Sequence, residues 1–164
     1  MSVPGYIVGQ LSGRGFWDAM EDYVRSDLGL KHTFLGNTDM TGYDRKETPC
    51  RCWQWEKEDI IAPAGAQNAD IEDLLLFGEM QCDGRRPYLK MCHEIQGACN
   101  DSTDSGLAWR LDKSMPISWH TGAAGPYHAW LGINRKTGTS VAVGINYGLV
   151  NAEELGFAVL RNLQ

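Results

Sequence analysis

The residues best suited to chemistry lie in one uncharged stretch in the later part of this chain. No Asp, Glu, Lys or Arg occurs between Lys113 and Arg135, yet the stretch contains His120 and His128. His120 opens the triplet His-Thr-Gly, which Ala123 follows. Small residues beside an imidazole and a hydroxyl let another molecule approach the backbone closely. We therefore predict that this triplet lies on a strand that forms a ligand-binding edge.

The cysteines offer two other kinds of chemistry. They are Cys50, Cys52, Cys82, Cys92 and Cys99. One of these thiols, paired with His93, His120 or His128, could act as the nucleophile of an amidase. Cys82, Cys92, His93 and Cys99 could also converge on a metal, although zinc sites usually have Cys-x-x-Cys pairs. Buried or loop thiols are the simpler interpretation, and we predict neither a metal nor a cofactor.

The element that must position the triplet is a β-hairpin. The apolar run PISWHTGAAGPYHAWLGIN is followed by a polar turn at residues 135–138 and then by a second apolar run, SVAVGIN. Two apolar runs joined by a short turn containing Gly predict a hairpin with a buried face. Alternation places Tyr127 and Leu131 on one face and His128 and Trp130 on the other, without indicating which face is inside.

Helical patterns flank the predicted strands. Residues 6–11 fit the end of a helix, residues 16–28 have helical spacing with Gly29 as a stop, and residues 88–95 fit a short helix. Asn68 or Asp70 can cap another helix. At Asn151 the sequence has a capping box, and Leu155, Val159 and Leu163 supply one apolar side to the closing helix.

The remaining segments complete an α+β prediction. Residues 33–59 have little periodicity and contain Trp53 and Trp55, which could line a ligand groove or pack on the surface. Residues 106–111 alternate well enough to form a strand that leads into the hairpin. We expect an antiparallel sheet with flanking helices in a single domain over residues 1–164.

Composition limits the partners. With 43% hydrophobic and 22% charged residues, the chain is typical of soluble globular proteins. A net charge of -6 argues against nucleic acid or an anionic membrane as a partner. No apolar run reaches the roughly 20 residues that cross a bilayer, and the chain begins without signal-peptide features. These features predict a cytoplasmic protein, whereas a chain that extends upstream would fit a secreted or periplasmic one.

In this order, the segments resemble the later part of the serine β-lactamase and penicillin-binding-protein-like family, especially class C β-lactamases, esterases and D-aminopeptidases. His120-Thr121-Gly122 is similar to the family box Lys/His-Thr/Ser-Gly on the strand that flanks the active site. Residues 123–134, 141–146 and 152–163 resemble the following turn, strands and closing helix. Residues 5–13, 27–33, 64–65 and 73–77 resemble earlier family segments. The literal Lys136-Thr137-Gly138 lies in the predicted turn, so we do not assign it to the box.

The resemblance implies roles for the site residues. His120 would orient the substrate's carboxylate or assist proton movement, and Thr121 would hydrogen-bond the substrate. The backbone N–H of Ala123 would be one of two oxyanion donors. Gly122 and Tyr127 would complete the substrate-binding set.

The chain departs from the family pattern at the nucleophile. No Ser-x-x-Lys occurs in the sequence, and the positions of the family Tyr-x-Asn motif are filled by Met1, Ser2 and Val3. The chain therefore looks like the second half of a serine hydrolase acting on esters, amides or D-amino acid peptides, and we do not expect it to catalyse hydrolysis unaided. The alternative is a pseudoenzyme, a binding or scaffold domain that kept the fold. In either case we expect a dimer, a partner chain or a rearranged fold, because the family sheet takes strands from both chain ends.

Overall fold

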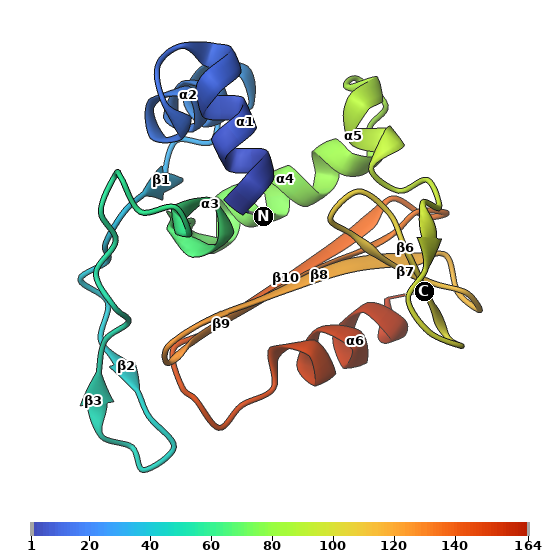
Figure 1. The fold of residues 1–164 in the computed structure, drawn as a ribbon. Coiled ribbons are helices and arrows are strands. Elements are labelled where there is room, and N and C mark those ends of the chain that lie inside the picture. The colour runs from blue at the N-terminus through green and yellow to red at the C-terminus, as the bar shows by residue number, and fades with distance from the viewer. Residues whose placement is uncertain (1, 164) are drawn as a thin grey trace.

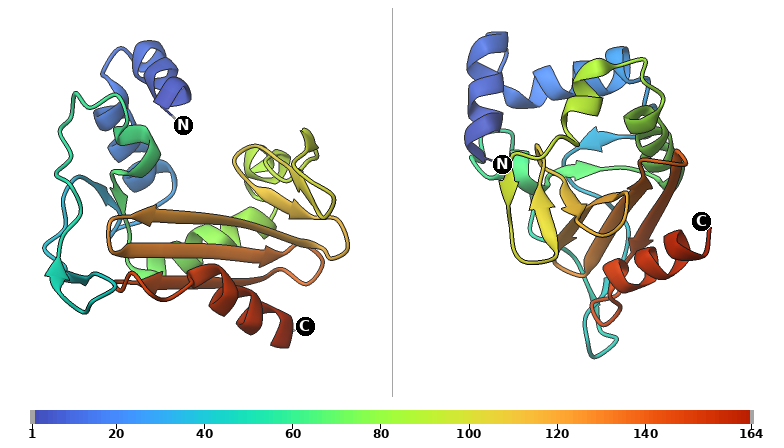
Figure 2. Two further views of the ribbon diagram at one scale, coloured as in Figure 1. Left: turned by 60° about the horizontal axis from the view of Figure 1, so that its bottom comes forward. Right: turned by 90° about the vertical axis from the view of Figure 1, so that its right-hand side faces the viewer.

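A six-stranded antiparallel sheet, of order β10-β9-β8-β7-β6-β5, forms the centre of the molecule (Figure 1). The structure is a computed structural model and describes residues 2–163. The strands are β5 (Gly97–Ala98), β6 (Thr103–Ser105), β7 (Arg110–Asp112), β8 (Ile117–Ala124), β9 (Tyr127–Asn134) and β10 (Thr139–Ile145). Helix α4 (Ile71–Cys82) covers one face and α6 (Ala152–Asn162) the other (Figures 1 and 2). This arrangement confirms the predicted α+β class.

The longest strands, β8, β9 and β10, form a meander in place of the predicted single hairpin. The first apolar run contains two strands, which turn at Gly125-Pro126. Gly125 has a φ of 59°, and Gly at the first central position followed by Pro suits a tight two-residue turn. The predicted turn at residues 135–138, which includes Lys136-Thr137-Gly138, is confirmed between β9 and β10.

Both faces of the sheet are buried. On one face Ile117, Trp119, Trp130, Val141 and Val143 pack with Leu160 of α6. On the other face Trp109, Leu111, Leu131 and Ile133 pack with Leu74 and Phe77 of α4. Neither set of alternating β9 residues is therefore a solvent face, because each is covered by its own helix.

The predicted cap at Asn151 is confirmed, but the predicted apolar side of α6 does not face the sheet. The side chain of Asn151 accepts hydrogen bonds from the backbone N–H groups of Glu153 and Glu154. Leu155, Val159 and Leu163 are exposed, at 47%, 39% and 56%. The buried positions are instead Ala152, Gly156 and Leu160. A glycine stands at position 156 because the ring of Trp130 occupies the space where a side chain would lie.

The earlier part of the chain forms short helices and strands around α4. The helices are α1 (Ser2–Ser12), α2 (Phe16–Asp22), the π-helical turn η1 (Tyr23–Asp27), α3 (Ala62–Gly65) and α5 (Pro87–Met91), and the strands are β1 (Phe34–Leu35), β2 (Gly42–Tyr43), β3 (Pro49–Cys50) and β4 (Gln67–Asn68). The helices predicted at residues 6–11 and 16–28 are confirmed, and Asp70 caps α4 by accepting from the N–H of Asp73. The helix predicted at 88–95 ends at Met91, and the strand predicted at 106–111 begins only at Arg110.

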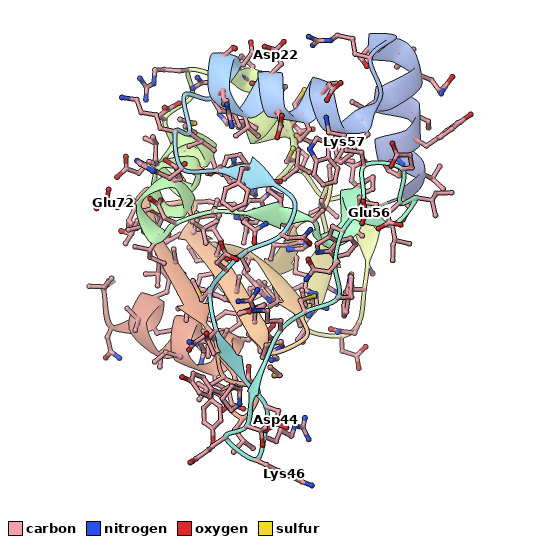
Figure 3. All side chains as sticks on the ribbon, turned by 90° about the vertical axis from the view of Figure 1, so that its left-hand side faces the viewer. Asp22, Asp44, Lys46, Glu56, Lys57 and Glu72 are labelled. Carbon is pink, nitrogen blue, oxygen red and sulfur yellow. The ribbon has the colours of Figure 1, made fainter. Side chains whose placement is uncertain are left out.

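Residues 33–59 form the long irregular segment that was predicted, and Figure 3 shows it crossing one side of the molecule with Asp44 and Lys46 near its tip. The segment is tied to the sheet just before β2, because Tyr127 donates its hydroxyl to the carbonyl of Met40 and Asn146 donates its side-chain amide to the carbonyl of Thr41. Of the two tryptophans, Trp55 is buried at 8% and Trp53 is exposed at 52%. Among residues 2–163, no helix has the length and apolar character needed to span a bilayer.

The contact between Trp130 and Gly156 makes a prediction about stability. A Cβ added at Gly156 would lie 2.2 Å from a ring carbon of Trp130, so we expect Gly156→Ala to lower the free energy of unfolding by about 1–3 kcal/mol. Gly97→Ala is the matched control, because nothing lies within 4 Å of the added carbon there. Urea denaturation followed by circular dichroism measures both, and equal stabilities would contradict the packing described.

Candidate functional site

The strand that carries the His-Thr-Gly triplet has an open edge. Strand β7 pairs with β8 only at Ser118 and Trp119, and within residues 2–163 no strand continues the pairing along residues 120–124. His120, Gly122 and Ala123 are exposed along this edge. Exposed backbone on a strand edge can accept an extended ligand. The structure thus gives the triplet the exposed strand edge that a binding role requires.

The register shows which backbone groups point outward. Ala124 and Tyr127 flank the two-residue turn, so they form the first hydrogen-bonded pair of the β8–β9 ladder. Hydrogen-bonded and non-hydrogen-bonded pairs alternate along an antiparallel ladder. The N–H groups of Ala123 and Thr121 therefore point away from β9, toward the open edge. An N–H fixed in this way can donate to a negatively charged oxygen.

A small hollow lies beside this edge on the face that α6 covers. Its volume is about 190 Å³, and its lining residues are Thr121, Gly122, Ala123, His128, Ala129, Asn151, Ala152 and Glu153. Three of the predicted site residues, Thr121, Gly122 and Ala123, are thus brought together. His120 and Tyr127 are not among the lining residues.

His120 lies on the opposite face of β8 from Thr121, because successive strand residues alternate. The side chain of His120 is accessible at the edge, but neighbouring protein atoms partly shield it from water, which lowers its pKa, and the nearby positive charge of Arg110 lowers the pKa further. The imidazole is therefore neutral near pH 7. A neutral imidazole can accept a proton at one nitrogen and donate its N–H to a carboxylate at the other, so both roles predicted for His120 stay predictions.

Tyr127 is held by the irregular segment. Its hydroxyl donates to the carbonyl of Met40, and a Cβ added at Gly42 would lie 3.0 Å from its ring. The contacts seen for Tyr127 fix the position of residues 40–42 against the sheet. The predicted substrate contact of Tyr127 remains a prediction.

Glu153 lines the hollow and was not predicted. Its carboxylate accepts a hydrogen bond from the indole N–H of Trp119 at 3.3 Å and lies 3.9 Å from the guanidinium of Arg110. These contacts connect the start of α6 to β7 and β8. The helix dipole favours acids anywhere in the first turn, so the sequence gave no separate signal for a second role of Glu153.

Three of the five thiols, and the buried histidine His93, have surroundings unlike those of a cysteine nucleophile and its base. Burial raises the pKa of Cys52, Cys82 and Cys92, which keeps these thiols protonated. His93 is buried against the ring of Trp109, at 4.7 Å between ring centroids, with its Nε2 3.2 Å from the side-chain oxygen of Gln81. In the part of the chain that is described, no three His, Cys, Asp or Glu side chains are grouped as metal ligands.

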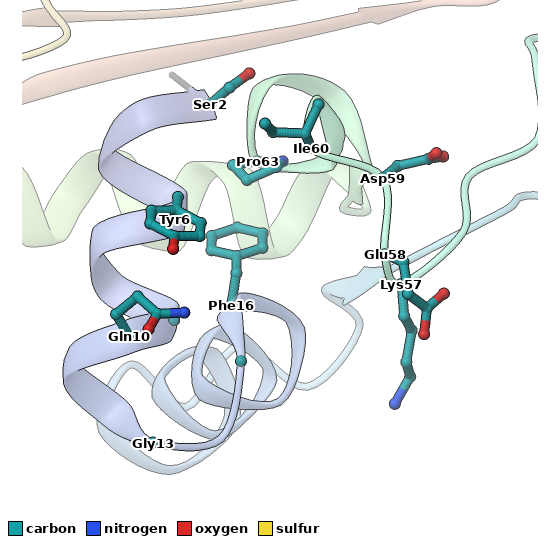
Figure 4. Close-up of a pocket in the computed structure, with 12 residues that line it drawn as sticks. Ser2, Tyr6, Gln10, Gly13, Phe16, Lys57, Glu58, Asp59, Ile60 and Pro63 are labelled. Atoms are coloured by element: carbon teal, nitrogen blue, oxygen red, sulfur yellow. The ribbon is translucent and has the colours of Figure 1, made fainter.

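A larger pocket lies away from the triplet, between α1 and the segment before α3 (Figure 4). Its volume is about 480 Å³, and Tyr6, Phe16, Ile60 and Pro63 supply its apolar walls. Its polar rim includes Gln10, Lys57, Glu58 and Asp59. Helix α3 contacts both α1 and β8, so it connects this pocket to the strand that carries the triplet.

Comparison with solved structures identifies the fold. A β-lactamase/D-alanine carboxypeptidase from Pseudomonas syringae has a TM-score of 0.83 and 16% identity, over 99% of this chain and 58% of that one. A class C β-lactamase from Rhodobacter sphaeroides has a TM-score of 0.82 and 14% identity, over 99% and 59%. The octameric penicillin-binding protein homologue from Pyrococcus abyssi has a TM-score of 0.81 and 17% identity, over 97% and 40%.

The chain has the fold of a part of the class C β-lactamases. This part spans 40–59% of the length of these three structures and is consistent with a C-terminal portion of the β-lactamase fold. Neither a scan of protein-family models nor a search of curated protein sequences finds a match. The resemblance drawn from the sequence is therefore confirmed at the level of the fold.

His93 makes a prediction about pH. Burial lowers its pKa from 6.5 to about 4, with a smaller contribution from Arg135. The unfolded chain therefore binds the proton more readily, and stability falls as the pH drops from about 6.5 to 4, by about 3 kcal/mol in all. The free energy of unfolding, measured by urea titration across this range, should fall less steeply in His93→Gln. The exposed-site control His32→Gln should keep the steep fall, and equal slopes in all three proteins would refute the assignment.

Proposed function

We propose that this chain is the substrate-binding part of a β-lactamase-like serine hydrolase, which cleaves esters, amides or D-amino acid peptides through an acyl-enzyme. The observation that carries the proposal is the open edge at residues 120–124, which bears His-Thr-Gly on a fold shared with β-lactamases. A D-alanine carboxypeptidase among the similar structures supports the substrate class.

In the proposed reaction, the serine oxygen attacks the substrate carbonyl while the serine proton passes to a base. The carbonyl oxygen becomes negatively charged, and the outward N–H of Ala123 donates to it. The leaving group departs with a proton, and water then cleaves the acyl-enzyme. Thr121 hydrogen-bonds the substrate, and neutral His120 accepts or relays a proton.

The nucleophile in this proposal belongs to another polypeptide segment. The 164 residues contain no Ser-x-x-Lys, and the solved structures contain a further portion that this chain does not match. An apolar surface on α1 and the adjoining loop fits as its docking place, because Val3, Tyr6, Ile7, Ile60 and Ile61 are all 49–72% exposed. Since α3 joins this surface to β8, a segment seated there would lie beside the strand that carries the triplet.

Labelling with a fluorophosphonate probe tests where the nucleophile resides. An affinity-tagged chain expressed in its native cells should co-purify with a serine-reactive species, whereas the isolated chain should remain unlabelled. Labelling of the isolated chain would refute the proposal. Saturable ligand binding without any labelling, weakened by His120→Ala, would instead establish a non-catalytic binding domain.

A backbone substitution tests the oxyanion role of Ala123. Ala123→Pro removes the outward N–H at an edge position, where proline is tolerated. Turnover by the labelled assembly should fall about 100- to 1,000-fold with little change in folding. Ala123→Gly keeps the N–H and should retain most of the turnover. Equal turnover in both variants would exclude this amide as a donor.

A further inference from the structure

The hollow beside the open edge of β8 is formed by two elements of this chain. Residues 121–123 of β8 and residues 151–153 at the start of α6 are among those that line it. Its volume of about 190 Å³ is below the roughly 300–1,000 Å³ of sites that hold a drug-sized ligand, so it suits one terminal group of a substrate. Because Ala123 is part of the lining, a group in the hollow would lie beside the carbonyl that the outward N–H of Ala123 binds in the proposed reaction.

Glu153 gives the hollow a carboxylate. Among the described residues that line it, Glu153 is the one acid, and none is Lys or Arg. Its Oε2 makes both contacts of the carboxylate, with the indole N–H of Trp119 and the guanidinium of Arg110. Trp119 lies on the same face of β8 as Thr121, so the carboxylate lies on the face where the hollow opens. Within residues 2–163 no hydrogen bond reaches Oε1, which leaves this oxygen available to a ligand.

The start of α6 does not offset this negative charge. Helix N-termini commonly bind anions through their free N–H groups. Here the side chain of Asn151 already accepts hydrogen bonds from the N–H groups of Glu153 and Glu154, and Glu154 adds a second carboxylate to the same turn. Arg110 supplies one opposing charge, but it lies 3.9 Å away and 56% of its side chain is exposed, so solvent screens it. The hollow therefore favours a cation over an anion.

We propose that Glu153 determines specificity, by selecting substrates that carry a protonated amino group beside the scissile carbonyl. The inference rests on the proposed hydrolase function, and it narrows the substrates to amides, esters and peptides of amino acids with a free amine. Oε1 of Glu153 accepts a charge-assisted hydrogen bond from the ammonium group, while the N–H of Ala123 binds the carbonyl oxygen. A carboxylate in the same place is repelled, and an acylated amine loses the charge that Glu153 recognises.

Binding to the isolated chain tests this selectivity without any turnover. Three small probes differ in charge: D-alaninamide carries an ammonium group, N-acetyl-D-alaninamide is neutral, and N-acetyl-D-alanine carries a carboxylate. In NMR titrations, D-alaninamide should shift the amide signals of Thr121, Ala123 and Glu153. It should bind about fivefold more tightly than the neutral probe, and the anionic probe should bind most weakly. Added salt should reduce these differences, because it screens the charge of Glu153.

Charge-neutralising variants assign the effect to one side chain. Glu153→Gln keeps an acceptor for the indole of Trp119 and should abolish the preference for D-alaninamide. Glu154→Gln is the matched control, because Glu154 lies in the same turn, bonds to the side chain of Asn151 and does not line the hollow. This control should keep the preference. Arg110→Gln removes the competing cation and should strengthen binding of D-alaninamide about twofold, a gain that misfolding does not produce.

The absence of shifts at the hollow, equal binding of the three probes, or a preference that survives Glu153→Gln would overturn the inference. The fluorophosphonate result does not enter this binding test, so the inference and the proposed function fail separately. In the labelled assembly, the ratio of kcat/KM for D-alanine p-nitroanilide to that for its N-acetylated form should fall about fivefold in Glu153→Gln. An unchanged ratio would also overturn the inference.

Discussion

The packing of Trp130 between the sheet and α6 is the constraint on which the rest of this structure depends. Its fully buried ring lies over Gly132 and under Gly156, where an added Cβ would come within 1.9 Å and 2.2 Å of the ring. Because both neighbours are glycine, the helix approaches the sheet closely. That approach places Asn151 and Glu153 at the rim of the hollow beside Thr121. One large side chain thus determines both the closing layer and the shape of the candidate site.

Local sequence signals were sufficient to predict an element wherever the interaction that stabilises it is itself local. The caps at Asp70 and Asn151 act within a few residues, and both helices begin where those residues predict. The buried side of α6 could not be found in this way, because the sequence offers a better apolar stripe at Leu155, Val159 and Leu163. The non-local ring of Trp130 decides which side faces inward. The short strands β5 and β6 gave no periodic signal, because each has only two or three residues.

In the candidate site, too, some features could be predicted from the sequence and others depend on the fold. An open strand edge at His120-Thr121-Gly122 was predictable from small residues in an uncharged stretch. Successive residues of a strand face opposite sides, so His120 and Thr121 do so once β8 is known to continue through both. The direction of the Ala123 amide required the register with β9, which depends on the turn at Gly125-Pro126. Glu153 joins the hollow only through folding, since 30 or more residues separate it from Trp119 and Arg110.

The contacts that hold the irregular segment on either side of its tip also bear on how the molecule moves. Tyr127 holds Met40, Asn146 holds Thr41, and the backbone of Cys52 lies against the turn at Gly125. Residues 40–41 and 52 are therefore held against the sheet on both sides of the β2–β3 hairpin. Because Met40 contacts Tyr127 and Cys52 contacts Gly125, a shift of this part of the segment would displace the β8–β9 turn as well.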